Sequence, residues 1–318
     1  MAARPDRFLP SRPGGPRRRG GLVAAAFAAA AVTAAGGAVP ALARTPQPAP
    51  SPSAAHGAGT AATGTNDATK AHTAYLKAHA PADHMGLSLA LSRAASSVAR
   101  AGVPMLPARA DPVYGDDVSS HQGQVNWGQA AANGGKFAYV KATEGTYYTN
   151  PDFSQQYSGS YGAGMTRGAY AFAIPSYSSG TSQAGFFVSH GGGWSRDGRT
   201  LPGVLDIESN PYGPKCYKLS QSVMVTWIRS FTNEYLALTG RRPVIYTSTA
   251  WWSACTGNYG GFAADPLWIV HPASGPGTLP AGWTTYAFWQ YANSGPLPGD
   301  QDVFNGSSAA LTRLADGT

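Results

Sequence analysis

The sequence from residue 111 onward predicts an α/β fold, built as a mainly parallel barrel. Short apolar runs alternate there with segments of helical periodicity, which is the pattern of consecutive strand–helix units. The last apolar runs follow one another too closely for a full helix between each pair. All 8 Trp of the chain lie in this part, so its roughly 208 residues can bury one sizeable core.

The first half of this part alternates regularly between the two kinds of element. Strands are expected at residues 114–118, 137–142, 166–172 and 203–208, with helices at 127–132, 152–163 and 178–190 between them. The pair Gly134-Gly135 follows the first helix, where glycine readily adopts the left-handed conformation that ends helices.

The second half contains the longest predicted helix, from an N-cap at Ser220 to Gly240. Its apolar residues recur at steps of four, three, four and three and form one stripe, which consists of Met224, Ile228, Phe231, Tyr235 and Leu238. Further strands are expected at residues 243–247, 267–271 and 286–291, and a last short piece lies near 302–304.

The net charge of +7 belongs to the N-terminal part of the chain. Residues 1–43 carry six Arg and one Asp, and residues 44–110 carry six basic and two acidic residues. Residues 111–318 carry 11 basic and 13 acidic residues, so the predicted barrel is slightly acidic. Without a basic stripe on the folded part, we expect no nucleic-acid partner.

Residues 1–43 read as a secretory signal peptide. A basic stretch at 12–19 precedes an apolar, Ala-rich stretch at 21–39, and Ala41-Leu42-Ala43 forms a small-x-small cleavage site. The alternative is a membrane anchor, but the Ala/Gly richness and the cleavage site favour removal. We therefore expect a secreted, extracellular protein without a membrane segment after cleavage, and leave the general and twin-arginine export routes open.

Residues 44–110 are rich in Ala, Pro, Ser and Thr and poor in aromatic residues. This composition cannot bury a core, so we expect a linker without fixed structure. The catalytic domain is expected at residues 111–318.

The chain has two cysteines, Cys216 and Cys255. In an oxidising compartment two cysteines pair by default, so we expect one disulfide, which stabilises by about 4 kcal/mol in the chain-entropy model. A metal site is disfavoured because no further ligands lie at zinc-like spacing. We expect neither a metal nor a cofactor.

One short strand carries two carboxylates, in the stretch Leu205-Asp206-Ile207-Glu208. Alternate residues of a strand share a face, so Asp206 and Glu208 are rooted about 6.6 Å apart on one side. At that separation a buried acid tends to keep its proton, and an acid beside a carboxylate is the pair that breaks a glycosidic bond. The alternative is a solvated acidic strand edge, which is common by chance.

Other polar residues lie at the ends of the predicted strands. They are Asp116, Asp117, Glu144, Tyr170, Tyr246, His271, Gln290, Tyr291 and Asp302. In a parallel barrel the carboxyl ends of all strands meet on one face, where the chemistry of such folds is built. This alignment favours a site over a solvated edge, although the residues alone separate neither Asp116 from Asp117 nor Asp300 from Asp302.

Six motifs together resemble the muramidases of glycoside hydrolase family 25, the Chalaropsis-type lysozymes. They are Gly115-Asp-Asp-Val-Ser-Ser-His-Gln-Gly123, Phe137-Ala-Tyr-Val-Lys-Ala-Thr-Glu-Gly145, Arg167-Gly-Ala-Tyr-Ala-Phe172, Leu201-Pro-Gly-Val-Leu-Asp-Ile-Glu208, Val244-Ile-Tyr-Thr247 and Phe288-Trp-Gln-Tyr291. The resemblance implies an irregular TIM-like (β/α) barrel of about eight strands with fewer than eight helices. It also implies hydrolysis of the β-1,4 bond between N-acetylmuramic acid and N-acetylglucosamine in peptidoglycan.

Carried over by position, the resemblance implies that Glu208 is the catalytic acid and Asp206 its partner carboxylate. It selects Asp117 and Asp302 as the two further carboxylates. The cleft wall is expected from residues at the strand ends, namely Glu144, Tyr170, Tyr246, Trp289 and Gln290. A root spacing of about 6.6 Å decides neither for a retaining nor for an inverting reaction. We favour a retaining route assisted by the 2-acetamido group of the substrate, with a direct nucleophile as the alternative.

The expected partner is the polysaccharide of peptidoglycan, bound by a monomer. Two other readings remain. One is an endo-glycosidase acting on chitin-like polymers, and the other is a cell-wall-binding module without catalysis. The complete Asp206/Glu208 pair argues against the second.

Overall fold

The computed structural model describes residues 62–86 and 112–318. The predicted signal peptide and much of the predicted linker lie outside these ranges. Within them, no helix combines the length and the apolar character that are needed to cross a bilayer.

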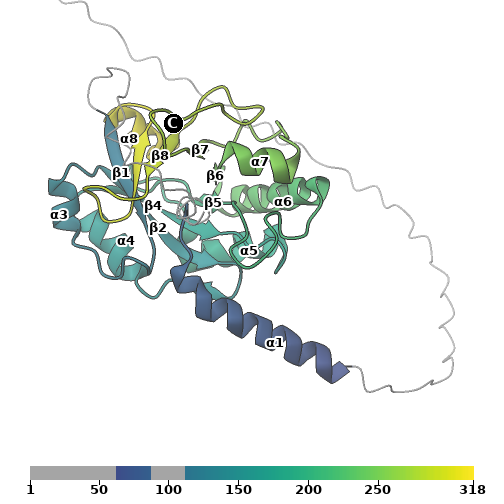
Figure 1. Cartoon of the computed structure of the whole chain (residues 1–318). Helices are drawn as coiled ribbons and strands as arrows, with labels where there is room; N and C mark the ends of the chain where they lie inside the picture. Colours follow the sequence, from purple (N-terminus) through teal and green to yellow (C-terminus); the bar gives the residue numbers. More distant parts are fainter. Residues whose placement is uncertain (1–61, 87–111) are drawn as a thin grey trace, which may run out of the picture. The chain divides into compact units, whose positions relative to one another are not determined.

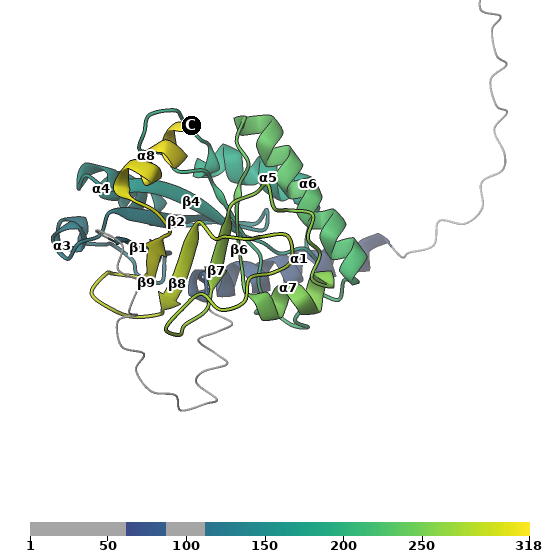
Figure 2. The ribbon, with the colours of Figure 1, turned by 90° about the horizontal axis from the view of Figure 1, so that it is seen from above.

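Eight strands form a closed barrel. They are β1 (Val113–Val118), β2 (Phe137–Glu144), β4 (Thr166–Phe172), β5 (Val204–Asp206), β6 (Val244–Thr247), β7 (Leu267–Val270), β8 (Phe288–Ala292) and β9 (Asp300–Phe304). Their order around the barrel is β1-β9-β8-β7-β6-β5-β4-β2, and β2 pairs with β1 to close the ring. Figure 2 shows β9, β8, β7 and β6 side by side in this order. The strand β9 runs antiparallel to both neighbours, whereas the other ring pairings are parallel.

Helices surround the barrel (Figure 1). They are α3 (Trp127–Ala132), α4 (Phe153–Gly162), α5 (Gly180–Phe187), α6 (Gln221–Thr239), α7 (Thr249–Thr256) and α8 (Ser308–Asp316). With α1 (Ala62–His79), the described residues hold seven α-helices. The irregular TIM-like barrel of about eight strands and fewer than eight helices is therefore confirmed. The sequence patterns did not predict α1, α7, α8 or the two-residue strand β3 (Tyr148–Thr149), which pairs with the end of β2.

Alternation along the strands divides the core into two layers. The barrel interior is filled by large aromatic side chains, among them Phe137, Tyr139, Tyr170, Tyr246, Trp268 and Phe288. The outer strand faces pack with the surrounding helices, and Met224, Ile228, Phe231 and Tyr235 of α6 are buried there. Leu238 is 50% exposed, so the predicted apolar stripe ends one turn earlier than expected. Gly240 ends α6 with a left-handed φ of 71°.

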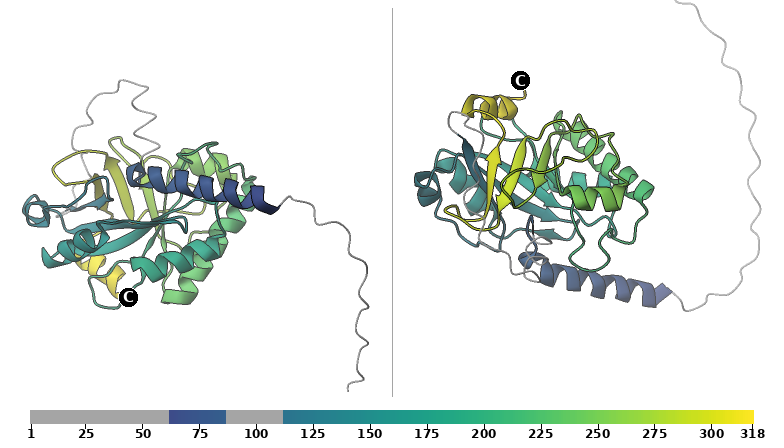
Figure 3. Two further views of the ribbon diagram at one scale, coloured as in Figure 1. Left: turned by 90° about the horizontal axis from the view of Figure 1, so that it is seen from below. Right: turned by 45° about the horizontal axis from the view of Figure 1, so that its top comes forward.

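The expected absence of fixed structure over residues 44–110 is wrong for the described part of that stretch. Residues 62–79 form α1, and a 3-10 turn follows at Ala80–Ala82. The helix lies outside the barrel (Figure 3). It is almost entirely polar and small in character, but Leu76 is buried at 1% exposure, and the hydroxyl groups of Thr73 and Tyr177 hydrogen-bond at 3.0 Å. Tertiary contacts therefore hold a segment whose composition alone predicts no structure.

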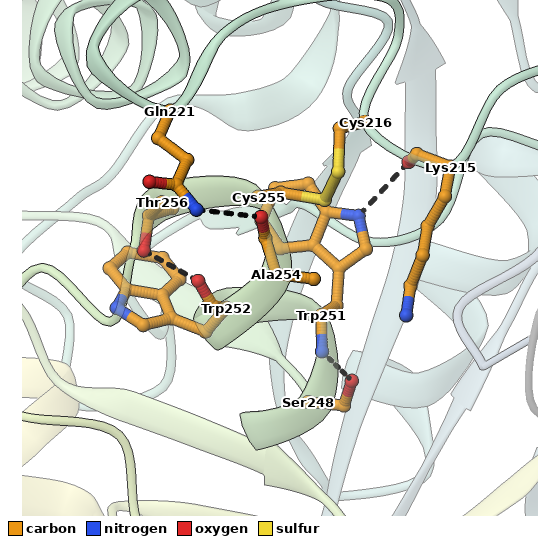
Figure 4. The surroundings of a disulfide bond; sticks show 9 residues. All are labelled: Lys215, Cys216, Gln221, Ser248, Trp251, Trp252, Ala254, Cys255 and Thr256. Carbon is orange, nitrogen blue, oxygen red and sulfur yellow. Dashed lines mark hydrogen bonds between the residues drawn. A yellow bond between two sulfur atoms is a disulfide. The ribbon is translucent and has the colours of Figure 1, made fainter.

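The predicted disulfide is confirmed. Cys216 lies in the loop between β5 and α6, and Cys255 lies in α7 (Figure 4). Their Cα atoms are 5.3 Å apart, within the usual range for a disulfide. The indole Nε1 of Trp251 donates to the carbonyl of Lys215 at 3.2 Å, so a side chain of the same helix also contacts this loop.

Candidate active site

The strand β5 brings Asp206 and Glu208 to the carboxyl end of the barrel. Asp206 is its last residue and is completely buried, and Glu208 follows at 3% exposure. Leu205 and Ile207 pack in the outer core layer instead. The two-residue spacing thus separates two carboxylates from two apolar neighbours, as strand alternation predicts.

The surroundings of Asp206 favour its neutral form. Its pKa is raised well above the ordinary value, first by burial and then by the negative charge of Glu208. The positive charge of Lys141 acts in the opposite direction. Among the described residues neither carboxylate oxygen of Asp206 has a hydrogen-bond partner, so no hydrogen bond compensates the loss of hydration. Two neighbouring acids in such a site share their protons unequally.

Asp117 and Asp300 complete a group of four carboxylates. The side-chain amide of Gln290 donates to Asp117 Oδ2 at 2.9 Å and to Asp300 Oδ2 at 3.0 Å. The hydroxyl of Tyr246 donates to Gln290 Oε1 at 2.7 Å, which fixes the orientation of the amide. Burial raises the pKa of Asp117 to about 7. We call Asp117, Asp206, Glu208 and Asp300 the carboxylate site.

The structure separates the carboxyl groups that the sequence left ambiguous. Alternation along β1 places Asp116 on the face opposite Asp117. On β9, Asp300 pairs with Asp117, whereas Asp302 pairs with Gly115, one step deeper in the barrel. Asp302 is completely buried and accepts a hydrogen bond from the indole of Trp268 at 3.2 Å. Asp300 thus contacts Gln290 at the strand end, while Asp302 lies below it.

Lys141 is a member of the site that sequence reasoning missed. Its ammonium group is completely buried and lies 2.6 Å from Glu144 Oε2. Glu144 also accepts hydrogen bonds from the hydroxyl groups of Tyr147, at 2.5 Å, and Tyr212. The alternation of Phe137, Tyr139 and Lys141 along β2 was a readable signal, because it assigns the lysine to the barrel interior.

Two of the residues predicted to line the cleft, Tyr170 and Tyr246, are in the interior layer with Gln290. The prediction for Trp289 is not supported, because Trp289 belongs to the outer core layer. It is 1% exposed, and its indole donates to the carbonyl of His271 at 2.8 Å. Gln290 and Trp289 are consecutive on one strand, so they necessarily face opposite sides.

Residues upstream of the barrel also reach the site. The backbone amide of Gly86 donates to Glu208 Oε1 at 2.8 Å, and the amide of Met85 donates to the hydroxyl of Tyr170 at 3.4 Å. The Met85 side chain is completely buried within the interior layer of the barrel. No pattern in the sequence predicted this contact.

Comparison with known proteins agrees with this geometry. Residues 116–300 match the family described as Glycosyl hydrolases family 25. The chain is 51% identical over 218 residues to Lysozyme M1 of Streptomyces globisporus, covering 67% of this chain and 74% of that protein. It is 47% identical over 210 residues to the N,O-diacetylmuramidase of Chalaropsis sp, covering 64% of this chain and all of that protein.

Solved structures give the same assignment. The muramidase from Acremonium alcalophilum is 53% identical with a TM-score of 0.64, and the match covers 65% of this chain and 100% of that one. The lysozyme from Streptomyces coelicolor is 51% identical with a TM-score of 0.64, covering 66% of this chain and 100% of that one. With the barrel and its carboxylates, these matches show that the chain belongs to glycosyl hydrolases family 25 and is a glycoside hydrolase.

Proposed function

We propose that this protein is a secreted N-acetylmuramidase that cleaves the β-1,4 bond between N-acetylmuramic acid and N-acetylglucosamine in peptidoglycan. Glu208 acts as the general acid and Asp206 as its partner carboxylate. Asp117 is a further carboxylate of the site, as the family resemblance implies, and the contact of Asp300 with Gln290 favours it over Asp302 for the fourth. The relatives named as lysozyme and muramidase support this substrate class.

The observation that carries the proposal is the buried Asp206/Glu208 pair at the end of β5. Two acids with different environments divide the roles of proton donor and anion between them. Contact with water in an open site lowers the pKa of Asp206, and the positive charge of Lys141 acts in the same direction. Asp206 is then the anion, and Glu208 is the group that carries a transferable proton.

In the proposed reaction, Glu208 gives its proton to the glycosidic oxygen as the bond from that oxygen to the anomeric carbon breaks. The carbonyl oxygen of the 2-acetamido group attacks the anomeric carbon and forms a cyclic oxazolinium ion. Asp206 orients the acetamido group and balances the positive charge. Water then attacks the anomeric carbon as the bond from that carbon to the acetamido oxygen breaks, and it gives a proton to the Glu208 carboxylate. This restores the acetamido group and the protonated acid. The configuration is retained.

The remaining assignments complete the proposal. Residues 1–43 direct export and are removed, and residues 111–318 form the catalytic domain, which acts as a monomer. Peptidoglycan polysaccharide is the partner. Gln290, Tyr170 and Tyr246 line the substrate cleft, while Glu144 is fixed by Lys141 and two tyrosines at its edge.

The test combines clearing of bacterial cell-wall suspensions with identification of the new reducing ends. Muramic acid at the reducing ends supports the proposal. Equal or better cleavage of chitin oligosaccharides indicates the alternative substrate. Wall binding by a folded protein that releases no reducing ends indicates a binding module and contradicts the proposed catalysis.

A further inference from the structure

Residues 80–86 occupy the position in front of the carboxylate site. Ala80, Asp83, Met85 and Gly86 are all buried in this segment, although it precedes the barrel in sequence. We call residues 80–86 the occluding segment. Only some of its residues face the barrel, since the intervening Pro81 and Ala82 are exposed.

The occluding segment hydrogen-bonds to Lys141 and Glu208 of the site. The ammonium group of Lys141 donates to the carbonyl oxygens of Ala80 at 3.1 Å and Asp83 at 2.7 Å. Together with Glu144, these carbonyls account for the three donors of the lysine. On the other side of the site, the Gly86 amide occupies Glu208. The ammonium group of Lys141 on β2 and one carboxylate oxygen of Glu208, just after β5, are therefore already engaged by the chain itself.

The contact between Gly86 and Glu208 also opposes the proposed chemistry. A general acid must reach the glycosidic oxygen to transfer its proton. While Gly86 is in place, its backbone amide occupies Glu208 Oε1 at 2.8 Å, where a leaving-group oxygen would have to approach.

The space around Gly86 is too small for a side chain. A Cβ at this position lies 2.7 Å from Gln290 Oε1, 2.9 Å from Asp300 Oδ2 and 3.3 Å from the hydroxyl of Tyr246. Gly86 also has a φ of 81°, in the left-handed region that favours glycine. The backbone at Gly86 thus lies within contact distance of Gln290 and Asp300. A sugar ring that binds at these groups must displace it.

Contacts on either side of the occluding segment anchor it. In α1, Leu76 is buried and the ring of Tyr75 meets that of Tyr212 edge to face at 6.2 Å. The rings of His84 and His121 stack at 5.1 Å. A pocket of about 400 Å³ lies beside Asp300, and His84 forms part of its wall. The open space next to the site is therefore bounded by the occluding segment.

We infer that the carboxylate site is an interaction surface for residues 80–86 of the same chain, and that this segment lowers the activity of the enzyme by competing with the glycan. The inference rests on the proposed muramidase function. Because the segment is joined to the barrel through residues 87–111, it competes with substrate at a high effective concentration. Cutting or displacing the connection removes this advantage and opens the site.

The experiment uses the full chain with substitutions that displace the segment. Met85→Asp places a charge in the apolar interior, and Gly86→Trp cannot fit beside Gln290 and Asp300. Ala82→Asp is the matched control, because Ala82 is exposed in the same segment. Initial rates of reducing-end release from soluble, uncrosslinked glycan strands are compared. Displacement is expected to raise the rate at least about tenfold in both variants, whereas the control stays at the parent rate.

A second measurement does not depend on catalysis. In the Glu208→Gln background, binding of a tetrasaccharide of alternating N-acetylglucosamine and N-acetylmuramic acid is followed by calorimetry. Met85→Asp is expected to tighten the apparent dissociation constant at least about tenfold. If a displaced variant fails to fold, a specific protease site inserted within residues 87–111 and cut after folding replaces it.

The outcomes separate the inference from the proposed function. A parent chain that is as active as the displaced variants overturns the occlusion and leaves the muramidase function intact. Tighter binding in the displaced variant without any reducing-end release from folded protein supports occlusion and contradicts the proposed catalysis. Equal tetrasaccharide affinity in parent and displaced chains overturns the occlusion whatever the activity.

Discussion

Asp117 and Asp300 lie directly opposite each other on β1 and β9 and share the side-chain amide of Gln290. One amide group thereby links the first strand of the barrel to the last two. The two buried carboxylates repel each other, and the amide of Gln290 offsets part of this repulsion because it donates to both.

We predict that Asp300→Asn lowers muramidase activity at least about tenfold, because it removes a charge from the carboxylate site. Asp302→Asn is the comparison, since Asp302 lies one step deeper and contacts Trp268. Both variants are expected to melt at or above the parent temperature, because each relieves repulsion among buried acids. Rates with soluble glycan strands and thermal melts test this. A large loss in Asp302→Asn alone would assign the role to Asp302 instead.

Glu208→Gln removes the transferable proton and preserves the shape of the side chain. We expect activity to fall at least about 10²-fold, which is the usual contribution of a positioned acid. Glu234→Gln on α6 is the control, because it makes the same chemical change away from the site. Near-parent muropeptide release by a normally melting Glu208→Gln protein contradicts the assigned acid.

Asp206→Asn is predicted to cripple the enzyme as well, since every mechanism considered needs a charge at this position. Its stability should not fall, because the native carboxylate is buried with a strongly raised pKa and pays a desolvation cost. The measurement is a rate assay paired with calorimetric melting at neutral pH. Retained activity with a lowered melting temperature is the opposite pattern and contradicts this role.

Replacing both Cys216 and Cys255 by serine should lower the free energy of unfolding by about 4 kcal/mol in the chain-entropy model. For a domain of this size that corresponds to a melting temperature lower by roughly 8–16 °C. The rate at 25 °C should be unchanged, because the disulfide lies in the outer layer of the fold. Non-reduced peptide mass spectrometry of the parent is the control, and two free thiols in secreted protein exclude the bond.

The occluding segment should bind its site more weakly as pH rises from acidic to neutral. Burial, and next the charge of Glu144, raise the pKa of Asp83 from 3.8 to about 7, while Tyr212 and Lys141 act against this. A raised carboxyl pKa means that the docked state holds the proton more tightly than the free segment. Docking is therefore most favourable below about pH 4, weakens through pH 7 and is constant above.

His84 acts in the opposite direction, because burial lowers its pKa and the proximity of His121 and Lys141 adds to this. The two groups act in opposite directions, so the Asp83→Asn variant isolates the contribution of Asp83. Tetrasaccharide binding in the Glu208→Gln background from pH 4 to 8 tests the prediction. Asp83→Asn should flatten the rise in affinity, and an unchanged pH profile in that variant contradicts it.

The sequence predicted the Asp206/Glu208 pair because a period of two on a short strand depends on local geometry alone. It could not separate Asp300 from Asp302, since both face the barrel interior and their depth depends on the register of β9 against β1. Trp289 and its neighbour Gln290 were both assigned to the cleft. Consecutive residues of a strand face opposite sides, so only one of them can line it. Lys141 was readable from the same alternation.

The structured part of residues 44–110 could not be predicted in this way. Helix α1 has little apolar surface, and its position depends on a few tertiary contacts such as those of Leu76 and Thr73. Composition averages over a segment and does not detect a single residue such as Gly86 that fits another part of the chain.

The position of the antiparallel strand β9 in the barrel determines when during synthesis the site can form. β9 pairs with β1 and supplies Asp300, yet it is the last strand to be synthesised. A nascent chain that ends before residue 300 has neither a closed ring nor the full set of acids. We therefore expect hydrolytic competence only after β9 has emerged from the ribosome, and a chain that stops before residue 300 is expected to be inactive.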